Sequence, residues 1–329
     1  MKHKIALIFT GGTISMKVDD RLKAAIPSMS SQEIMSLVTN IDQIAELDIV
    51  EFGAFPGPHM TPKRMMALKN IVQSKLNQPD ITGVVITHGT DNLEETAYLL
   101  DLSLTLTKPV VVVGSMRNGS ELGYDGPSNL AAAITTAIHP KSKHMGVLVV
   151  LNNEVNAAKE VTKTHTLSLD TFKSLEFGPL GIVDQDDVIY YRHPTASSKT
   201  ILTDDIEEDV YLIKSASGMD SRVLNFLVQS GVKGIVIEAM GRGNIPPEMM
   251  PGVKAAIQAH IPVVVVSRCP KGRVLGSYGY EGGGQQLIEM GAIFADNING
   301  QKARIQLMLA LKAANSHEEL QQMMTYHHI

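Results

Sequence analysis

The chain has 329 residues, of which 44% are hydrophobic and 19% are charged. This balance excludes disordered, collagen-like and low-complexity chains, and the length favours two domains of roughly 150 residues. A net charge of −5, the absence of tryptophan and a single cysteine, Cys269, argue against a nucleic-acid-binding surface, an internal disulfide and a cysteine-rich metal site.

The first apolar run, residues 5–9, ends at a pair of glycines and is too short for the apolar region of a signal peptide. No apolar run approaches the roughly 18 residues that a membrane-spanning helix needs. We therefore expect a cytoplasmic protein that does not bind membranes.

Strand-like and helix-like segments alternate along the first half of the chain. Short runs of Val, Ile and Leu, typical of buried parallel strands, cover residues 5–9, 49–52, 83–87, 110–113 and 147–151. Segments of helical length lie between them, at residues 31–38, 62–76, 93–105 and 127–138. This alternation predicts the α/β class, with a doubly wound, mainly parallel sheet. Asn92 and Glu95 give the helix at 93–105 a capping-box pattern.

The pattern weakens after about residue 178 and resumes near residue 210 with a smaller set of elements. Strands are expected at 210–213, 234–237 and 263–267, and helices near 220–229, 247–259 and 300–314. We therefore expect an N-terminal catalytic α/β domain at 1–190, a linker at 191–209 and a smaller C-terminal α/β domain at 210–329.

Chemistry-bearing side chains follow several of the predicted strands, where ligands of open α/β sheets bind. The segments are TGGTIS (10–15), THGTDN (87–92), GSMR (114–117) and VTKTH (161–165). They match neither the dinucleotide-binding nor the P-loop pattern, and no residues show metal-ligand spacing. Threonine hydroxyls, one lysine, one aspartate and glycine-turn amides favour acyl transfer without a metal or cofactor. In such a site a desolvated lysine serves as the base and backbone N–H groups bind the oxyanion.

Each of these features also has a purely structural interpretation. The GGT segment can be only a turn, and Asp91 can be a first-turn carboxylate that complements a helix dipole. Lys163 can be a solvated surface lysine, and His88 is more typical of a packed core histidine than of a base. Two other classes stay open, an amino-acid-binding protein without turnover and, with less support, a nucleotide-binding protein.

Taken together, several segments resemble the bacterial L-asparaginase family. They are IFTGGTIS (8–15), VVITHGTDNLEETAYLLD (84–101), VVVGSMRN (111–118), DGPSNL (125–130), VTKTHT (161–166), TFKS (171–174), AMGRGNIPP (239–247) and GQKARIQLMLAL (300–311). The resemblance covers nearly the whole chain. It implies a type I-like, cytoplasmic amidohydrolase that converts asparagine to aspartate and ammonia without a cofactor. Glutamine is the main competing substrate.

The resemblance also implies roles for individual residues. Thr13 matches the nucleophile, and Thr90 with Asp91 and Lys163 matches a second catalytic set. Asp91 also matches the carboxylate that receives the α-amino group of the substrate. Two further matches are Ser115, whose backbone lies near the substrate amide, and Asn244, with which a neighbouring subunit closes the site. The C-terminal domain is expected to complete the site and the interface of a homodimer or homotetramer.

Three places depart from the family pattern. Residues 16–30 contain no tyrosine, although the family usually has one there to polarise the nucleophile; the nearest in sequence is Tyr98, on a predicted helix. The loop that binds the substrate carboxylate reads Gly57, Pro58, His59 and lacks the usual hydroxyl, which implies that backbone amides or His59 hold the carboxylate. Glu281 is a candidate for the acidic residue that some members donate from the C-terminal domain.

Overall fold

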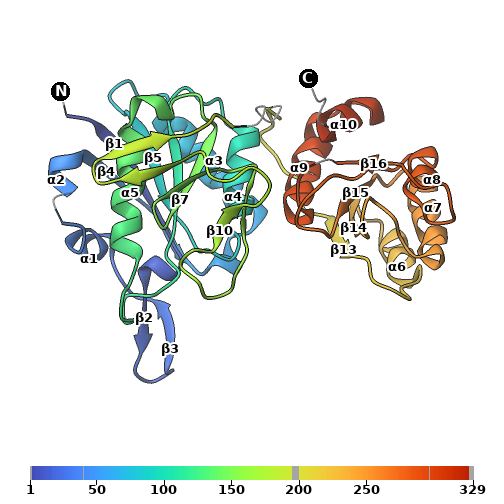
Figure 1. Cartoon of the computed structure of the whole chain (residues 1–329), viewed down its shortest axis with the longest axis horizontal. Coiled ribbons are helices and arrows are strands. Elements are labelled where there is room, and N and C mark those ends of the chain that lie inside the picture. Colours follow the sequence, from blue (N-terminus) through green and yellow to red (C-terminus); the bar gives the residue numbers. More distant parts are fainter. Residues whose placement is uncertain (1, 40, 195–199, 296, 326–329) are drawn as a thin grey trace. The chain divides into compact units, whose positions relative to one another are not determined.

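The chain folds into two compact units in the computed structural model, which describes residues 2–39, 41–194, 200–295 and 297–325 (Figure 1). Unit 1 is Met1–Thr200 and unit 2 is Ile201–Ile329. Residues 195–199 of the expected linker lie outside the described residues.

Unit 1 is built on an eight-stranded sheet with the order β12-β11-β8-β7-β6-β5-β1-β4. Its strands are β1 (Lys4–Gly11), β4 (Glu46–Phe55), β5 (Gly83–Thr87), β6 (Val110–Val113), β7 (Val147–Leu151), β8 (Glu154–Ala157), β11 (Gly181–Asp184) and β12 (Asp187–Tyr190). The strands from β4 to β7 pair in parallel, and β8, β11 and β12 pair antiparallel. The expected mainly parallel sheet is confirmed.

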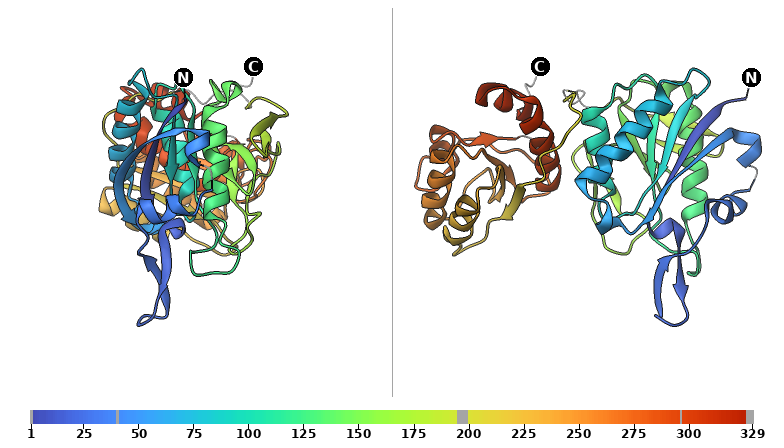
Figure 2. Two further views of the ribbon diagram at one scale, coloured as in Figure 1. Left: turned by 90° about the vertical axis from the view of Figure 1, so that its left-hand side faces the viewer. Right: turned by 180° about the vertical axis from the view of Figure 1, so that it is seen from behind.

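Helices cover both faces of this sheet, because successive residues of each buried strand point to opposite faces. On one face Leu7 belongs to the same apolar cluster as Ile134 of α5, and on the other Ile8 packs with Leu68 of α3 and Leu100 of α4 (Figures 1 and 2). The helices are α1 (Ser31–Ser36), α2 (Ile41–Ile44), α3 (Pro62–Leu76), α4 (Leu93–Ser103) and α5 (Gly126–Ile138). The sheet is therefore doubly wound, as predicted.

The start of α4 differs from the expected capping box. Asn92 is the N-cap residue, but its side chain makes no capping hydrogen bond. Its amide instead donates to the carbonyl of Met60, at 3.1 Å. The capping box is wrong because this amide connects α4 to the neighbouring loop.

Unit 1 also contains shorter strands and turns outside its main sheet. They are the antiparallel pairs β2 (Met16–Asp19) with β3 (Ala24–Pro27) and β9 (Val161–Lys163) with β10 (Phe172–Ser174), and the 3-10 turns η1 (Thr13–Ser15), η2 (Gly57–His59) and η3 (Pro140–Ser142). The β2–β3 hairpin projects from the rest of unit 1 (Figures 1 and 2). Three of these short elements, η1, η2 and β9, carry residues of the candidate site.

Unit 2 has a separate four-stranded parallel sheet with the order β13-β14-β15-β16. Its elements are β13 (Val210–Lys214), α6 (Arg222–Ser230), β14 (Gly234–Ala239), η4 (Pro247–Met249), α7 (Met250–Gln258), β15 (Val263–Ser267), α8 (Gly284–Glu289), β16 (Ile293–Phe294), α9 (Gly300–Ala313) and α10 (His317–Met324). Ile237 and Val265 pack with Leu224 of α6 and Val253 of α7 in its core. Unit 2 is thus the smaller α/β domain that the sequence predicted.

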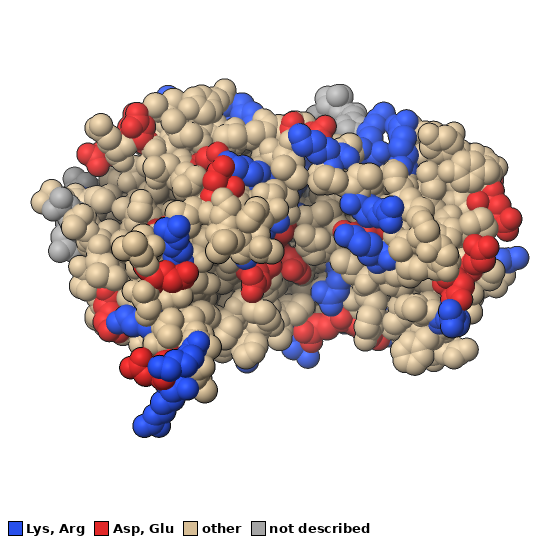
Figure 3. Space-filling model, turned by 60° about the horizontal axis from the view of Figure 1, so that its bottom comes forward, with Lys and Arg blue, Asp and Glu red and all other residues tan. Residues whose placement is uncertain are grey.

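The surface shows no strongly one-sided charge on the face drawn in Figure 3, where basic and acidic side chains are interspersed. Within the described part of the chain, no helix combines the length and apolar character that crossing a membrane requires. Cys269 is exposed and free.

Candidate functional site

Three loops at the carboxyl edge of the parallel strands approach each other closely enough that only glycine fits. A Cβ on Gly12 would lie 2.3 Å from the backbone nitrogen of Gly89, and Gly12 has a φ of +84°. A Cβ on Gly89 would in turn lie 2.7 Å from the Cα of Gly57. The loops after β1, β5 and β4 are therefore in direct backbone contact, as close approach at a ligand site requires.

Of the three hydroxyls in residues 10–15, at the end of β1 and in the turn after it, two are used in the fold. Thr10 donates to the carbonyl of Thr87 at 2.7 Å, and Ser15 donates to the carbonyl of Gly12 at 2.9 Å. Thr13 is half-buried, and its hydroxyl has no hydrogen-bond partner among the described residues. The structure therefore leaves the Thr13 hydroxyl available for a ligand.

Lys163 joins two residues of the second loop. Its ammonium lies 2.9 Å from the Thr90 hydroxyl oxygen and 2.9 Å from a carboxylate oxygen of Asp91. Thr90 is buried, and the Lys163 side chain is only 17% exposed, whereas that of Asp91 is 64% exposed. Lys163 is 73 positions from Thr90 and 72 from Asp91 in sequence, and the three residues form one contiguous polar cluster with an acidic group open to solvent.

The strand that carries Lys163 is held by a buried carboxylate. Glu94, in the first turn of α4, accepts from the hydroxyl of Thr162 at 3.0 Å and from the backbone N–H of Lys163 at 3.5 Å. Glu94 lies within the family-like segment 84–101, and the sequence alone predicts no role for it. Its contacts show that it fixes β9 against α4 and so sets the position of the Lys163 side chain.

Backbone donors lie on the same loops. The N–H groups of Thr13 and Thr90 make no hydrogen bond to other described residues. A Cβ on Gly114, at the end of β6, would lie 3.2 Å from the methyl of Thr90, so the 114–117 loop adjoins this cluster. Ser115 is fully buried, and its hydroxyl donates to the carbonyl of Arg117 at 2.8 Å. The Ser115 hydroxyl is therefore used within its own loop.

His88 is a packed core residue. It is fully buried between the carbonyl of Gly89, 2.8 Å from Nδ1, and the hydroxyl of Thr96, 2.8 Å from Nε2. Burial lowers the pKa of His88 to about 4, which keeps the ring neutral. The structural interpretation of His88 holds, and the residue connects β5 to α4.

The loop expected to hold the substrate carboxylate begins at Gly57, next to Asp91. Gly57 is buried, and a Cβ added to it would lie 3.3 Å from the Cβ of Asp91, while Pro58 and His59 are exposed. Arg64 donates to the carbonyl of His59, and its guanidinium lies 4.3 Å from the centre of the Phe55 ring. The loop therefore adjoins the cluster and has a cation at its outer side.

Two tyrosines bear on the absence of a tyrosine from residues 16–30, and Tyr98 lies on a helix as predicted. Tyr98 is fully buried in α4. Tyr124, in contrast, donates its hydroxyl to the carbonyl of Ile14, the residue after Thr13. Tyr124 lies between the family-like segments 111–118 and 125–130, and this position is the signal in the sequence that could have pointed to it.

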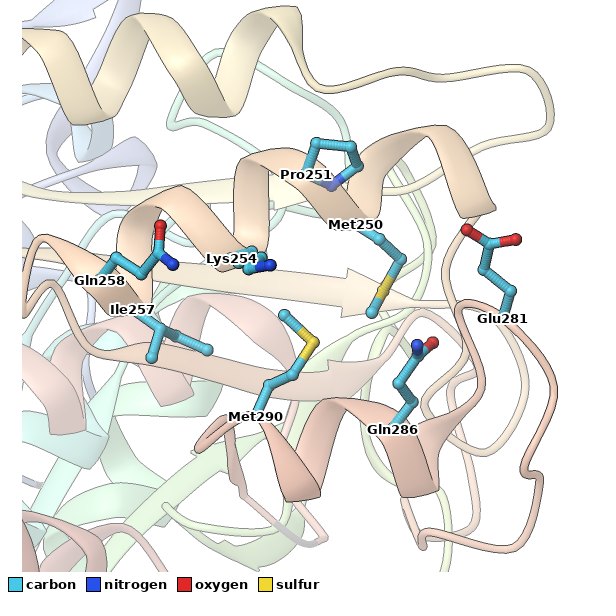
Figure 4. A pocket seen from close by; sticks show the side chains of 8 residues that line it. All are labelled: Met250, Pro251, Lys254, Ile257, Gln258, Glu281, Gln286 and Met290. Carbon is cyan, nitrogen blue, oxygen red and sulfur yellow. The ribbon is translucent and has the colours of Figure 1, made fainter.

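Asn244 and Glu281 lie on connected loops of unit 2. The side chain of Asn244 accepts from the N–H of Gly284 at 3.1 Å, and the N–H of Ile245 donates to Gly282 at 2.9 Å. Glu281 stands at one end of a pocket of about 660 Å³, in which Met250 and Met290 turn their sulfur atoms toward each other (Figure 4). Asn244 thus fixes the loop that presents Glu281.

Metal binding has no evident basis in the side chains that the structure describes. Within those ranges, no group of three or more His, Cys, Asp or Glu residues is placed to hold a metal ion.

Comparison with known proteins agrees with this arrangement. Residues 4–196 match the family model described as asparaginase, N-terminal, and residues 209–324 match the glutaminase/asparaginase C-terminal domain. The chain is 32% identical to an L-asparaginase of Bacillus licheniformis, over 94% of this chain and 96% of that one. It is 34% identical to a probable L-asparaginase of Deinococcus radiodurans, over 98% and 97% of the two chains.

A solved structure shares the whole fold. The crystal structure of a probable cytoplasmic L-asparaginase from Campylobacter jejuni superposes with a TM-score of 0.88 at 31% identity, covering 98% of this chain and 99% of the other. With both domain models matched in order and full-length relatives above 30% identity, the chain belongs to the asparaginase family.

Proposed function

We propose that the protein is an L-asparagine amidohydrolase that uses Thr13 as its nucleophile. The observation that carries the proposal is the double contact of Lys163, 2.9 Å from both Thr90 and Asp91, beside a loop whose Thr13 hydroxyl is unpartnered. The family membership and the relatives named L-asparaginases support the substrate class.

The reaction then proceeds in two steps, transfer of the aspartyl group to Thr13 and hydrolysis of the resulting ester. The Thr13 oxygen bonds to the side-chain amide carbon of asparagine, its proton passes to the amide nitrogen, and the C–N bond breaks to release ammonia. Water next attacks the resulting aspartyl ester, which returns the proton to Thr13 and releases aspartate. Free N–H groups of Thr13 and Thr90 are suited to bind the oxyanion of each tetrahedral intermediate.

The second threonine has a different role in this scheme. The Lys163 ammonium donates to the Thr90 oxygen, and a hydroxyl that accepts from a cation donates its own proton more strongly. Thr90 can thereby protonate the leaving nitrogen or orient the attacking water. Asp91, exposed on its outer side, is free to pair with the α-ammonium group of the substrate while it holds Lys163.

We extend the proposal to the rest of the expected site and to the assembly. Gly57, Pro58 and His59 would hold the substrate carboxylate, the backbone of Ser115 would face the amide, and Asn244 would act from a neighbouring subunit. A cytoplasmic homodimer or homotetramer follows from the same family resemblance. Light scattering coupled to size-exclusion chromatography measures the assembly, and a monomer would contradict it.

Ammonia release from asparagine and from glutamine, measured side by side, tests the activity. We expect turnover of asparagine, and we expect Thr13→Ala to lower kcat by about 10³-fold or more, because the covalent step is lost. Thr105→Ala, a truncation of an exposed threonine in the loop after α4, serves as the control and should leave kcat unchanged. Tight asparagine binding without ammonia release would instead identify an amino-acid-binding protein.

A further inference from the structure

Tyr124 reaches the turn that carries Thr13 from a distant part of the chain. Its hydroxyl donates to the carbonyl of Ile14 at 2.5 Å across 110 residues of sequence. The tyrosine is half-buried in the loop between β6 and α5. The contact therefore couples the loop after β6 to the loop after β1.

The turn around Thr13 is held by backbone hydrogen bonds, one of which runs from the N–H of Met16 to the carbonyl of Thr13. On one side the N–H of Gly12 donates to Phe55 at 2.9 Å, and on the other the carbonyl of Ser15 accepts from Ser28 and Met29. Within the turn, the carbonyl of Gly12 accepts from the N–H of Ser15 at 3.0 Å, and the carbonyl of Ile14 accepts from the Tyr124 hydroxyl. Tyr124 therefore adds a restraint from a distant part of the chain to the backbone that carries the Thr13 side chain.

The Tyr124 ring occupies space that Gly126 leaves free. An ideal Cβ on Gly126 would lie 2.3 Å from the ring and hydroxyl of Tyr124, so the absence of a side chain at Gly126 is what lets the ring occupy this place. Asp125, between them, accepts from the N–H groups of Met116 and Arg117 at 3.0 and 2.9 Å. The sequence Tyr-Asp-Gly thus orients the phenol toward Ile14.

We propose that Tyr124 is a positioning residue for the reaction, which holds the Thr13 turn in its attacking orientation through the Ile14 carbonyl. This inference rests on the proposed function of Thr13. Residues 16–30 offer no tyrosine, and Tyr124 brings a phenol to the same turn from the loop between β6 and α5.

The electrostatic surroundings suit a permanent donor. Burial, and secondly the charge of Asp125, raise the pKa of Tyr124 well above its ordinary value. The hydroxyl therefore keeps its proton and cannot serve as the base for Thr13. It acts through the geometry of the turn.

Tyr124→Phe tests the proposal, with Tyr190→Phe as the matched control. Tyr190 is also a half-buried tyrosine of unit 1, and it lies in β12, away from the site. Its hydroxyl is 2.7 Å from the hydroxyl of Ser142. Both variants lose one phenol hydrogen bond. We expect Tyr124→Phe to lower kcat for asparagine by about tenfold while KM changes less than about twofold, and Tyr190→Phe to leave both unchanged.

A second variant displaces the phenol without removing it. Gly126→Ala places a methyl group where the Tyr124 ring lies, so we expect a similar loss of kcat, and little further loss when it is combined with Tyr124→Phe. Equal kcat for Tyr124→Phe and Tyr190→Phe, with Thr13→Ala inactive, would overturn the positioning role alone. Full activity of Thr13→Ala would overturn the proposed function.

Discussion

The three hydroxyls of residues 10–15 differ in whether they can react with a ligand, because two of them are already hydrogen-bonded within the fold. Thr10 and Ser15 satisfy backbone carbonyls, so they stabilise the turn and are not free to react. Thr13 alone of the three has an available hydroxyl among the described residues. The family motif identified the segment, while the hydrogen bonds distinguish its members.

Thr90 and Lys163 should act as one unit, since a single hydrogen bond connects them. We expect Thr90→Val and Lys163→Met each to lower kcat by about 10³-fold, and the double variant to lose no more than the worse single one. Steady-state kinetics of the four proteins measure this cycle. Losses that multiply in the double variant would show that the residues act independently.

The control for this cycle is Lys173→Met. Lys173 lies on β10, the partner strand of β9, and pairs with Glu154 at 2.7 Å, so it is another partly buried, ion-paired lysine. Its loss should leave kcat within about twofold of the parent protein.

At the scale of elements, the apolar pattern predicted the bounds of strands that are buried on both faces more closely than those of an edge strand. β5, β6 and β7 are continuous apolar runs because helices cover both faces. β4 was expected at 49–52 but runs Glu46–Phe55; it is an edge strand, where charged residues are tolerated and interrupt the apolar pattern.

The contacts that assemble the site could not be predicted from local pattern. Glycine turns after β1 and β5 were visible, but their backbone contact is set by strand order, which brings β1 beside β5. The bond from Tyr124 to Ile14 likewise depends on two loops whose separation of 110 residues leaves no periodic signal. The resemblance supplied candidate residues, and tertiary packing decides which of them meet.

Gly12→Ala measures the contact between these loops. The added methyl would lie 2.3 Å from backbone that cannot move aside, so we expect a free energy of unfolding lowered by at least about 2 kcal/mol and loss of most activity. Gly178→Ala is the control, because Gly178 has a φ of +73° and nothing within 4 Å of its added methyl. It should cost only about 1 kcal/mol, from backbone strain. Urea denaturation compares them, and equal costs would contradict the argument.

At the scale of the whole molecule, each unit has its own sheet and its own apolar core. Length and composition favoured two domains, and the break in the βα alternation after about residue 178 indicated where the first one ends. The exact course of the connection could not be foreseen, because polar segments carry no hydrophobic periodicity.

Unit 1 should lose stability in mild acid because of His88. Burial lowers the pKa of this histidine from 6.5 to about 4, so the unfolded chain binds a proton below pH 6.5 that the folded unit does not bind until about pH 4. The free energy of unfolding that depends on neutral His88 is therefore fully present above pH 6.5. It falls by on the order of 3 kcal/mol as the pH drops toward 4.

Urea denaturation between pH 4 and pH 7 measures this effect. His88→Gln should flatten the pH dependence of the free energy of unfolding in this window, since glutamine does not titrate. His317→Gln, which removes an exposed histidine at the start of α10, should leave the dependence unchanged. An unaltered slope in His88→Gln would refute the assignment.

The exposed, solitary Cys269 makes the protein convenient for spectroscopy. Because it is the only cysteine in the sequence, a maleimide dye or nitroxide will attach at one place, in unit 2, with no thiols to remove first. Replacing Leu122 of unit 1, which is 97% exposed, by cysteine adds a second attachment point. Pulsed spin-resonance distances between the two labels would then report how far apart the units lie in solution, with and without asparagine.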